Sequence, residues 1–195
     1  MVFPVNTFNI LQLAFQVFLP NLVTYIWWGV SKNESNRGGY GMIKWNKEKT
    51  IPVNIDKLWE LFSAENIHRI MPNVIEHKVI EKREGVIGSK YQQKFKEGKR
   101  EETYIVEDLE YESTETMKHN KIGFTVAKSL EVEAAFTLIK LDENNTKFIY
   151  QGQTKGISTK GKVLLKIKGE KTGEKLVQDF MKLVGEEAVK QRNDE

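Results

Sequence analysis

Three histidines are the side chains of this sequence best suited to hold a metal ion or to move a proton. They are His68, His77 and His119, and each falls on a different expected element. Metal ligation by this set would need a carboxylate to complete it, and no HExxH motif places two histidines on one helix face. We therefore interpret all three as single histidines on the solvent side, and we predict no metal site.

Paired carboxylates are a second pattern that can perform acid–base chemistry. Glu131 and Glu133 share one face of an expected strand, and Glu101 and Glu102 begin another strand. Such acids beside lysines more often form a solvated surface, and lysines are abundant here, so we adopt that interpretation. The serines lack a nucleophile-elbow context, and no GxGxxG or GxxxxGK[ST] loop occurs. The sequence thus predicts neither an acyl-transfer site nor a cofactor.

The composition is typical of a globular protein with one domain. The chain has 195 residues, of which 30 are basic and 27 acidic, and its formal net charge is +3. Because these charges are evenly spread, they do not indicate a nucleic-acid partner. The absence of cysteine excludes disulfides, thiolate metal sites and a cysteine nucleophile. It fits a reducing compartment, and we expect a cytoplasmic protein.

The N-terminal segment, residues 1–41, differs from the rest of the chain. It carries no charge over residues 1–31 and is mostly apolar over residues 8–30. A stretch of that length could span a bilayer, which takes about 20 apolar residues. However, codons for Arg37-Gly38-Gly39 can spell a bacterial ribosome-binding sequence just before Met42. We favour a translation start at Met42, and a membrane anchor through residues 8–30 is the alternative.

Residues 42–195 show the pattern of an α+β domain. A first strand is expected over residues 43–53, followed by a short helix capped by Asn54 and a second short helix stopped by Pro72. From residue 74 to residue 155 the period of the apolar residues is close to two, which is typical of antiparallel strands.

A long helix with one apolar face is predicted over residues 172–192, with Thr172 as its N-cap. The preceding residues, 156–173, could start this helix early or form a separate turn. Within the sheet we expect a corner at Asn120-Lys121 between two strands, and a clear strand over residues 131–141.

This order of elements resembles the helix-grip fold of the SRPBCC superfamily, which includes START domains, pollen-allergen-like proteins and polyketide cyclase/dehydratase-like proteins. The opening residues KTIPVNIDKLWELFSAENIHRIMPNV are similar to the superfamily's first strand and two short helices. The closing residues EKLVQDFMKLVGEEA are similar to its long helix. The resemblance implies a curved antiparallel sheet of about seven strands wrapped on a long C-terminal helix, with two short helices after strand one.

The resemblance also implies a cavity between sheet and helix, entered near the two short helices, with a volume of ~300–1,000 Å³. His68 would then border the mouth as a candidate general acid or base. Gln93 is the strongest candidate lining residue, because a polar side chain between two inward aromatic residues needs a partner. The full set of candidates is mostly aromatic and comprises Trp59, Phe62, Met71, Tyr91, Gln93, Phe95, Tyr104, Met117, Phe124, Phe136, Phe148, Tyr150, Phe180 and Val184.

We favour a non-catalytic carrier or sensor that binds a small hydrophobic or amphipathic molecule in this cavity. The alternatives are a cyclase/dehydratase-like enzyme, in which Gln93, Tyr91, Tyr104 or His68 orients the substrate, and a regulator that binds a protein partner. The lysine-rich residues 155–171 could meet an anionic ligand or lipid headgroup, or serve solubility alone. A membrane contact is expected only if residues 1–41 are translated, and the oligomeric state stays open.

Overall fold

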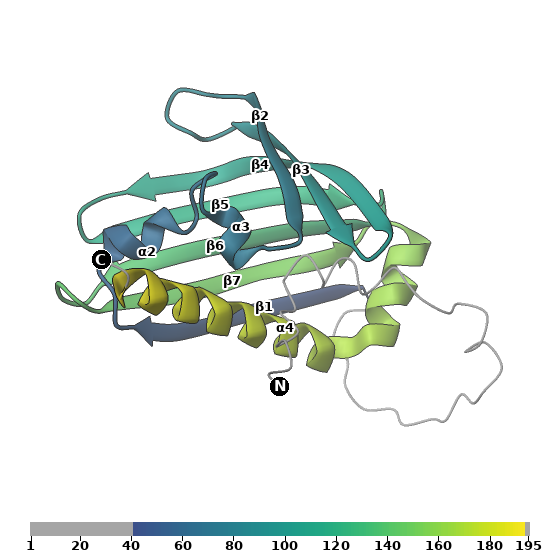
Figure 1. Ribbon diagram of the computed structural model, residues 1–195. Coiled ribbons are helices and arrows are strands. Elements are labelled where there is room, and N and C mark those ends of the chain that lie inside the picture. Colours follow the sequence, from purple (N-terminus) through teal and green to yellow (C-terminus); the bar gives the residue numbers. More distant parts are fainter. Residues whose placement is uncertain (1–40, 194–195) are drawn as a thin grey trace.

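The computed structural model describes residues 41–193, in which one curved sheet packs on three helices (Figure 1). The elements in chain order are β1 (Met42–Ile51), α2 (Ile55–Glu60), α3 (Ile67–Ile70), β2 (Val74–Glu81), β3 (Lys90–Glu97), β4 (Arg100–Ser113), β5 (Met117–Val126), β6 (Leu130–Lys140), β7 (Thr146–Gly156) and α4 (Thr159–Asn193). The expected translation start and the anchor over residues 8–30 concern residues 1–40, which lie outside this range. Between residues 41 and 193, no helix is long and apolar enough to cross a membrane.

The seven strands form one antiparallel sheet in the order β1-β7-β6-β5-β4-β3-β2. Strands β2 to β7 pair with their neighbours along the chain, while β1 returns to pair with β7, so that Met42 lies opposite Lys155. All three helices lie on the same side of the sheet (Figure 1). This arrangement confirms the expected sheet, the two short helices after strand one and the long C-terminal helix.

The predicted corner at Asn120-Lys121 is wrong, because both residues continue the ladder of β5. Asn120 lies opposite Tyr111 on one side and Phe136 on the other. The chain instead turns between β5 and β6 at Ala127 and Lys128, which have φ angles of 48° and 51°. Two consecutive residues with positive φ form the tight turn whose twist suits a hairpin, even without glycine.

Helix α4 begins at Thr159, so the prediction that Thr172 caps it is wrong. The side chain of Ser158 accepts a hydrogen bond from the backbone N–H of Gly161 (3.1 Å) and caps the first turn. The first turns pack very closely on the sheet, since a Cβ at Gly161 would collide with the Ser129 carbonyl oxygen. Figure 1 shows that these first turns run at an angle to the rest of the helix.

The hydrophobic core lies between the inner face of the sheet and the second half of α4. Its largest fully buried side chains include Phe95, Phe148, Tyr150 and Phe180. The rings of Tyr150 and Phe180 lie 5.2 Å apart, which joins β7 directly to α4. At the outer edge of this interface, Lys47 of β1 forms an ion pair with Glu174 of α4 at 2.6 Å.

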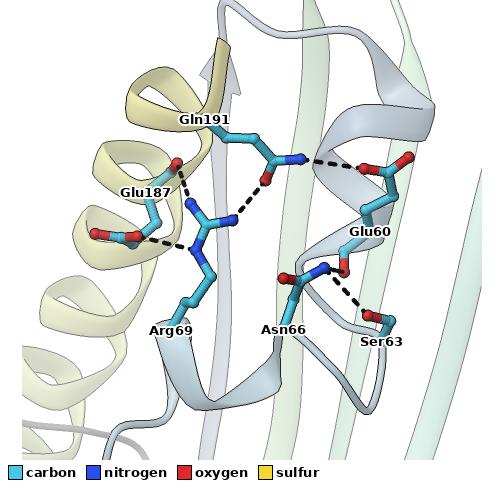
Figure 2. A network of polar contacts seen from close by, with 6 residues as sticks. All are labelled: Glu60, Ser63, Asn66, Arg69, Glu187 and Gln191. Atoms are coloured by element: carbon cyan, nitrogen blue, oxygen red, sulfur yellow. Dashed lines mark hydrogen bonds and ion pairs between the residues drawn. The ribbon is translucent and has the colours of Figure 1, made fainter. Parts of the chain in front are cut away.

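The short helices are held by polar contacts as well as by apolar packing. The Asn54 side chain accepts a hydrogen bond from the N–H of Asp56 (2.9 Å) and caps α2 as predicted. Arg69 of α3 donates to Glu187 (3.2 Å) and Gln191 (2.9 Å), both on α4, as Figure 2 shows. Gln191 in turn donates to Glu60 of α2 at 3.1 Å. Helices of this length are not stable alone. The Arg69 network supplies contacts that hold both short helices on α4.

Candidate functional site

A cavity of about 450 Å³ lies between the short helices and the inner face of the sheet. Residues of α2, α3 and the segment between them line one side, and residues of β2 to β7 line the other. The lining residues are Trp59, Glu60, Phe62, Ser63, Ala64, Ile67, Met71, His77, Val86, Tyr91, Gln93, Val106, Asp108, Tyr111, Asn120, Ile122, Phe124, Ala134, Phe136 and Tyr150. Most of the wall is apolar or aromatic, and a few polar groups gather on β2, β3, β4 and β5. Such a cavity suits a small molecule with one polar end.

A chain of hydrogen bonds crosses three neighbouring strands beside the cavity. The Tyr104 hydroxyl of β4 donates to Gln93 Oε1 of β3 (2.9 Å), and Gln93 Nε2 lies 2.9 Å from His77 Nδ1 of β2. Since Tyr104 fixes the orientation of the amide, Gln93 donates to His77, whose Nδ1 must accept. Burial lowers the pKa of His77, against smaller opposite effects of Asp108 and Glu65. His77 is therefore neutral at pH 7 and carries its proton on Nε2.

A second polar group of the wall is centred on Asp108, which is only 3 % exposed. Asn120 Nδ2 of β5 donates to Asp108 Oδ1 at 3.0 Å. Within the described residues, Asp108 Oδ2 and Asn120 Oδ1 are buried without a hydrogen-bond partner. Burial, followed by the interaction with the Asp108 carboxylate, raises the pKa of the nearby Tyr91 to about 12. Tyr91 is therefore a neutral hydroxyl, and its ring stacks on that of His77 with 5.0 Å between centroids.

Solved structures with the same arrangement identify the fold. The Zhui aromatase/cyclase from Streptomyces sp. R1128 aligns with a TM-score of 0.59 and 11% identity over 77% of this chain and 95% of that one. Ara h 8.0201 aligns with a TM-score of 0.56 and 13% identity over 77% and 99% of the two chains. Norcoclaurine synthase from Thalictrum flavum, in complex with dopamine and hydroxybenzaldehyde, gives a TM-score of 0.51 and 11% identity over 83% and 98%. No protein-family model and no curated protein matches this chain.

The chain has the helix-grip fold that these structures share. At these identities the likeness concerns the fold alone, and helix-grip proteins differ in what they do.

Eight of the candidate residues line the helix-grip cavity, namely Trp59, Phe62, Met71, Tyr91, Gln93, Phe124, Phe136 and Tyr150. The other candidates do not reach it. Phe95, Phe148, Phe180 and Val184 are fully buried in the core, and Tyr104 lies behind Gln93 with its ring against Phe124. Met117 is on the outer face of β5, because Asn120, Ile122 and Phe124 take the inner face and residues alternate along a strand.

The prediction of three solvent-side histidines is right only for His68, which is exposed and does not line the cavity. His77 is half-buried and lines the cavity, and His119 is also half-buried, with Nδ1 2.8 Å from the Thr137 hydroxyl. Neither partner is close in sequence, so no local pattern indicates these contacts. The expected solvated carboxylate surface agrees with the ion pair between Glu133 and Lys121 at 3.2 Å.

The sequence did not indicate Asp108, Tyr111 or Asn120 as lining residues. A register shift between Asp108 and Glu110 interrupts the pairing of β4 with β5. Because such a bulge adds one residue to a strand, both Asp108 and Tyr111 line the cavity despite their odd spacing. The alternation that includes Tyr104 and Val106 would have indicated Asp108, had its charge not argued for the solvent side.

The loop between β2 and β3 contributes a strained residue to the wall. Val86 lines the cavity and has a φ of 74°, in a region that β-branched residues rarely adopt. The preceding Gly85 also has a positive φ, of 76°, which glycine adopts without strain. Strain of this kind is often found at ligand sites, where surrounding packing holds it in place.

Proposed function

We propose that this protein binds a small hydrophobic or amphipathic molecule inside the helix-grip cavity and acts as a carrier or sensor. The observation that carries this proposal is the cavity of about 450 Å³, whose mostly apolar wall carries a group of buried polar side chains on β2 to β5. Burial of apolar ligand surface contributes roughly 25 cal/mol per Å², so an apolar body in this space gains several kcal/mol. The polar side fixes the orientation of the ligand.

The test is a titration of the full chain with aromatic and lipid-like compounds, followed by the shift in melting temperature. A ligand at 100 times its dissociation constant stabilises the folded protein by about 2.7 kcal/mol. The test variant is Phe136→Ser, which places a hydroxyl in the middle of the apolar wall and should weaken the response. The matched control is Leu141→Ser, at an exposed position just after the same strand. No response to any compound, or an equal response in both variants, would refute the proposal.

Native mass spectrometry of the protein isolated from its own cells supplies a complementary readout. A retained ligand appears as excess mass that disappears on denaturation. The denatured mass also decides between translation starts at Met1 and Met42.

A second candidate function is catalysis on a molecule held in the same cavity, in the manner of a cyclase. The observation that favours it is the neutral His77, which lines the cavity next to Tyr91 and can accept a proton as a general base. Two of the structural neighbours are an aromatase/cyclase and a synthase. This function predicts turnover that His77→Asn reduces at least tenfold while Phe124 and Phe136 still hold the substrate. Unchanged turnover in His77→Asn and in Tyr91→Phe would refute it.

A further inference from the structure

The polar side of the cavity contains a carboxylate oxygen that the protein itself does not satisfy. Asp108 is buried, and only its Oδ1 accepts a hydrogen bond, from Asn120 at 3.0 Å. Oδ2 is buried without a hydrogen-bond partner in the described part of the chain. A buried acceptor left without a donor is destabilising, and more so when it is charged. Proteins therefore rarely retain such an atom without a use for it.

The surroundings of Asp108 do not neutralise its charge. None of the ion pairs between the described residues includes it, and two titratable side chains that interact with it, His77 and Tyr91, are neutral at pH 7. Asn120 Oδ1, next to it on β5, is a second buried acceptor without a donor. The polar side of this cavity thus offers two unpaired acceptors and a negative charge, in a space lined mostly by apolar and aromatic side chains.

The Tyr150 hydroxyl is also buried without a hydrogen-bond partner in the described residues, but it lies near a possible partner. Burial raises its pKa well above the usual value, and the indole of Trp45 acts in the opposite direction. The two rings lie 5.5 Å apart, so Tyr150 has a potential partner in the protein. Asp108 has the Tyr91 hydroxyl as a neighbour, and their interaction raises the pKa of Tyr91, but Asp108 Oδ2 and Asn120 Oδ1 accept no hydrogen bond within the described residues.

We propose that the ligand of this cavity carries an N–H or O–H donor that binds Asp108 Oδ2, with its apolar body against Phe124 and Phe136. This inference rests on the proposed function and specifies the ligand class. Hydroxyl and ammonium heads share the required chemistry. An ammonium, with three donors, serves Oδ2 and Asn120 Oδ1 together. Molecules with a carboxylate or phosphate head are excluded, because Asp108 repels them and neutral His77 offers no compensating charge.

The experiment compares four probes with the same aromatic body, namely naphthylethylamine, naphthylethanol, ethylnaphthalene and naphthylacetate. Their dissociation constants for the full chain are measured by fluorescence near pH 7. We expect the amine and the alcohol to bind at least about tenfold more tightly than ethylnaphthalene, since one charge-assisted hydrogen bond contributes about 1.5 kcal/mol or more. Naphthylacetate should bind most weakly.

Two substitutions separate the contributions of charge and of the acceptor. Asp108→Leu should abolish the preference for donor heads while ethylnaphthalene still binds. Asp108→Asn keeps an acceptor of the same shape, so it should remove the advantage of the amine over the alcohol. Glu112→Leu, at an exposed position on the same strand, is the matched control and should change neither preference. If Asp108→Leu does not fold, Asp108→Asn and the four probes on the unsubstituted chain still decide the matter.

The outcomes distinguish this inference from the function on which it rests. Equal binding of the four probes would overturn the donor-head inference and leave cavity binding intact. It would mean that a water molecule or a rotated Tyr91 hydroxyl satisfies Oδ2. Binding of no probe would overturn both. A preference for the amine alone identifies ammonium ligands, and an equal preference for amine and alcohol identifies a neutral donor.

Discussion

A larger apolar side chain on the cavity wall should fill the cavity, and it should then both stabilise the protein and abolish ligand binding. Ala134 on β6 is the natural position for this, because it lines the cavity, is buried, and lies opposite Ile122 in the sheet. Ala134→Leu places a branched side chain in the space, with no polar group to bury. In a close-packed core the same substitution would be destabilising. A rise or a fall in the free energy of unfolding therefore tells whether the cavity is open.

The expected magnitude follows from the three carbon atoms that leucine adds. Each buried methylene contributes about 0.8 kcal/mol, or about 2.4 kcal/mol in total, and the fixed side chain loses about 0.5–1 kcal/mol of rotamer entropy. The net gain is about 1.5 kcal/mol in the free energy of unfolding. For a domain of this size that corresponds to a rise of about 3–6 °C in melting temperature.

The assay combines thermal unfolding with an ethylnaphthalene titration. The control is Ala135→Leu, because Ala135 is equally buried but does not line the cavity, so its substitution should leave the probe affinity unchanged. A fall in melting temperature of Ala134→Leu, together with unchanged probe binding, would refute the reasoning. Overpacking of a filled core costs about 1–3 kcal/mol and would produce that fall.

Other substitutions test the supports of the site. Arg69→Met should lower the free energy of unfolding by about 1–2 kcal/mol in urea titrations, since it removes half-buried charged hydrogen bonds between α3 and α4. As its control, Lys182→Met breaks only an exposed ion pair and should lower the free energy of unfolding by less than about 0.5 kcal/mol. Gly161→Ala should be destabilising by about 1–3 kcal/mol because its Cβ meets a backbone carbonyl. Gly185→Ala in the same helix meets only a flexible lysine end and should be neutral or stabilising by up to about 1 kcal/mol. Burial lowers the pKa of His77 from its usual 6.5 in the folded protein, so the unfolded chain binds the proton first and stability should fall as the pH drops below about 6.5. His77→Asn should remove that part of the pH dependence, and an unchanged profile would contradict the buried, neutral state.

The sheet and its inner face were predictable because the sequence alternates with the period of a strand. Tyr91, Gln93 and Phe95 follow this alternation, and the structure places all three on the inner face of β3. The short helices were predictable from their caps and stops, with Asn54 at the start of α2 and Pro72 after α3. These signals act within a few residues, so a single sequence contains them.

The features that the sequence did not reveal depend on contacts between distant residues. Whether an inward residue lines the cavity or fills the core is decided by α4, which covers Phe148 but leaves Phe136 next to the open space. The true start of α4 was hidden because its first turns carry exposed apolar residues, Val163 and Ile167, that do not form the face seen later in the helix. The polar side of the cavity was hidden by the bulge in β4 and by the rarity of a buried, unpaired aspartate.

The pairing of β1 with β7 has a consequence for the order in which this protein takes shape during synthesis. Strand β1 has no partner until β7 has been synthesised, because Met42 pairs with Lys155. Strands β1 and β7 together form the surface on which α4 packs. The hairpins from β2 to β6 can form as they leave the ribosome, because each pairs with a neighbour along the chain. Until β7 and α4 follow, β1 remains a single strand and the aromatic inner face stays open to water. A growing chain therefore exposes apolar surface for most of its synthesis, and the cavity is enclosed only in a late step.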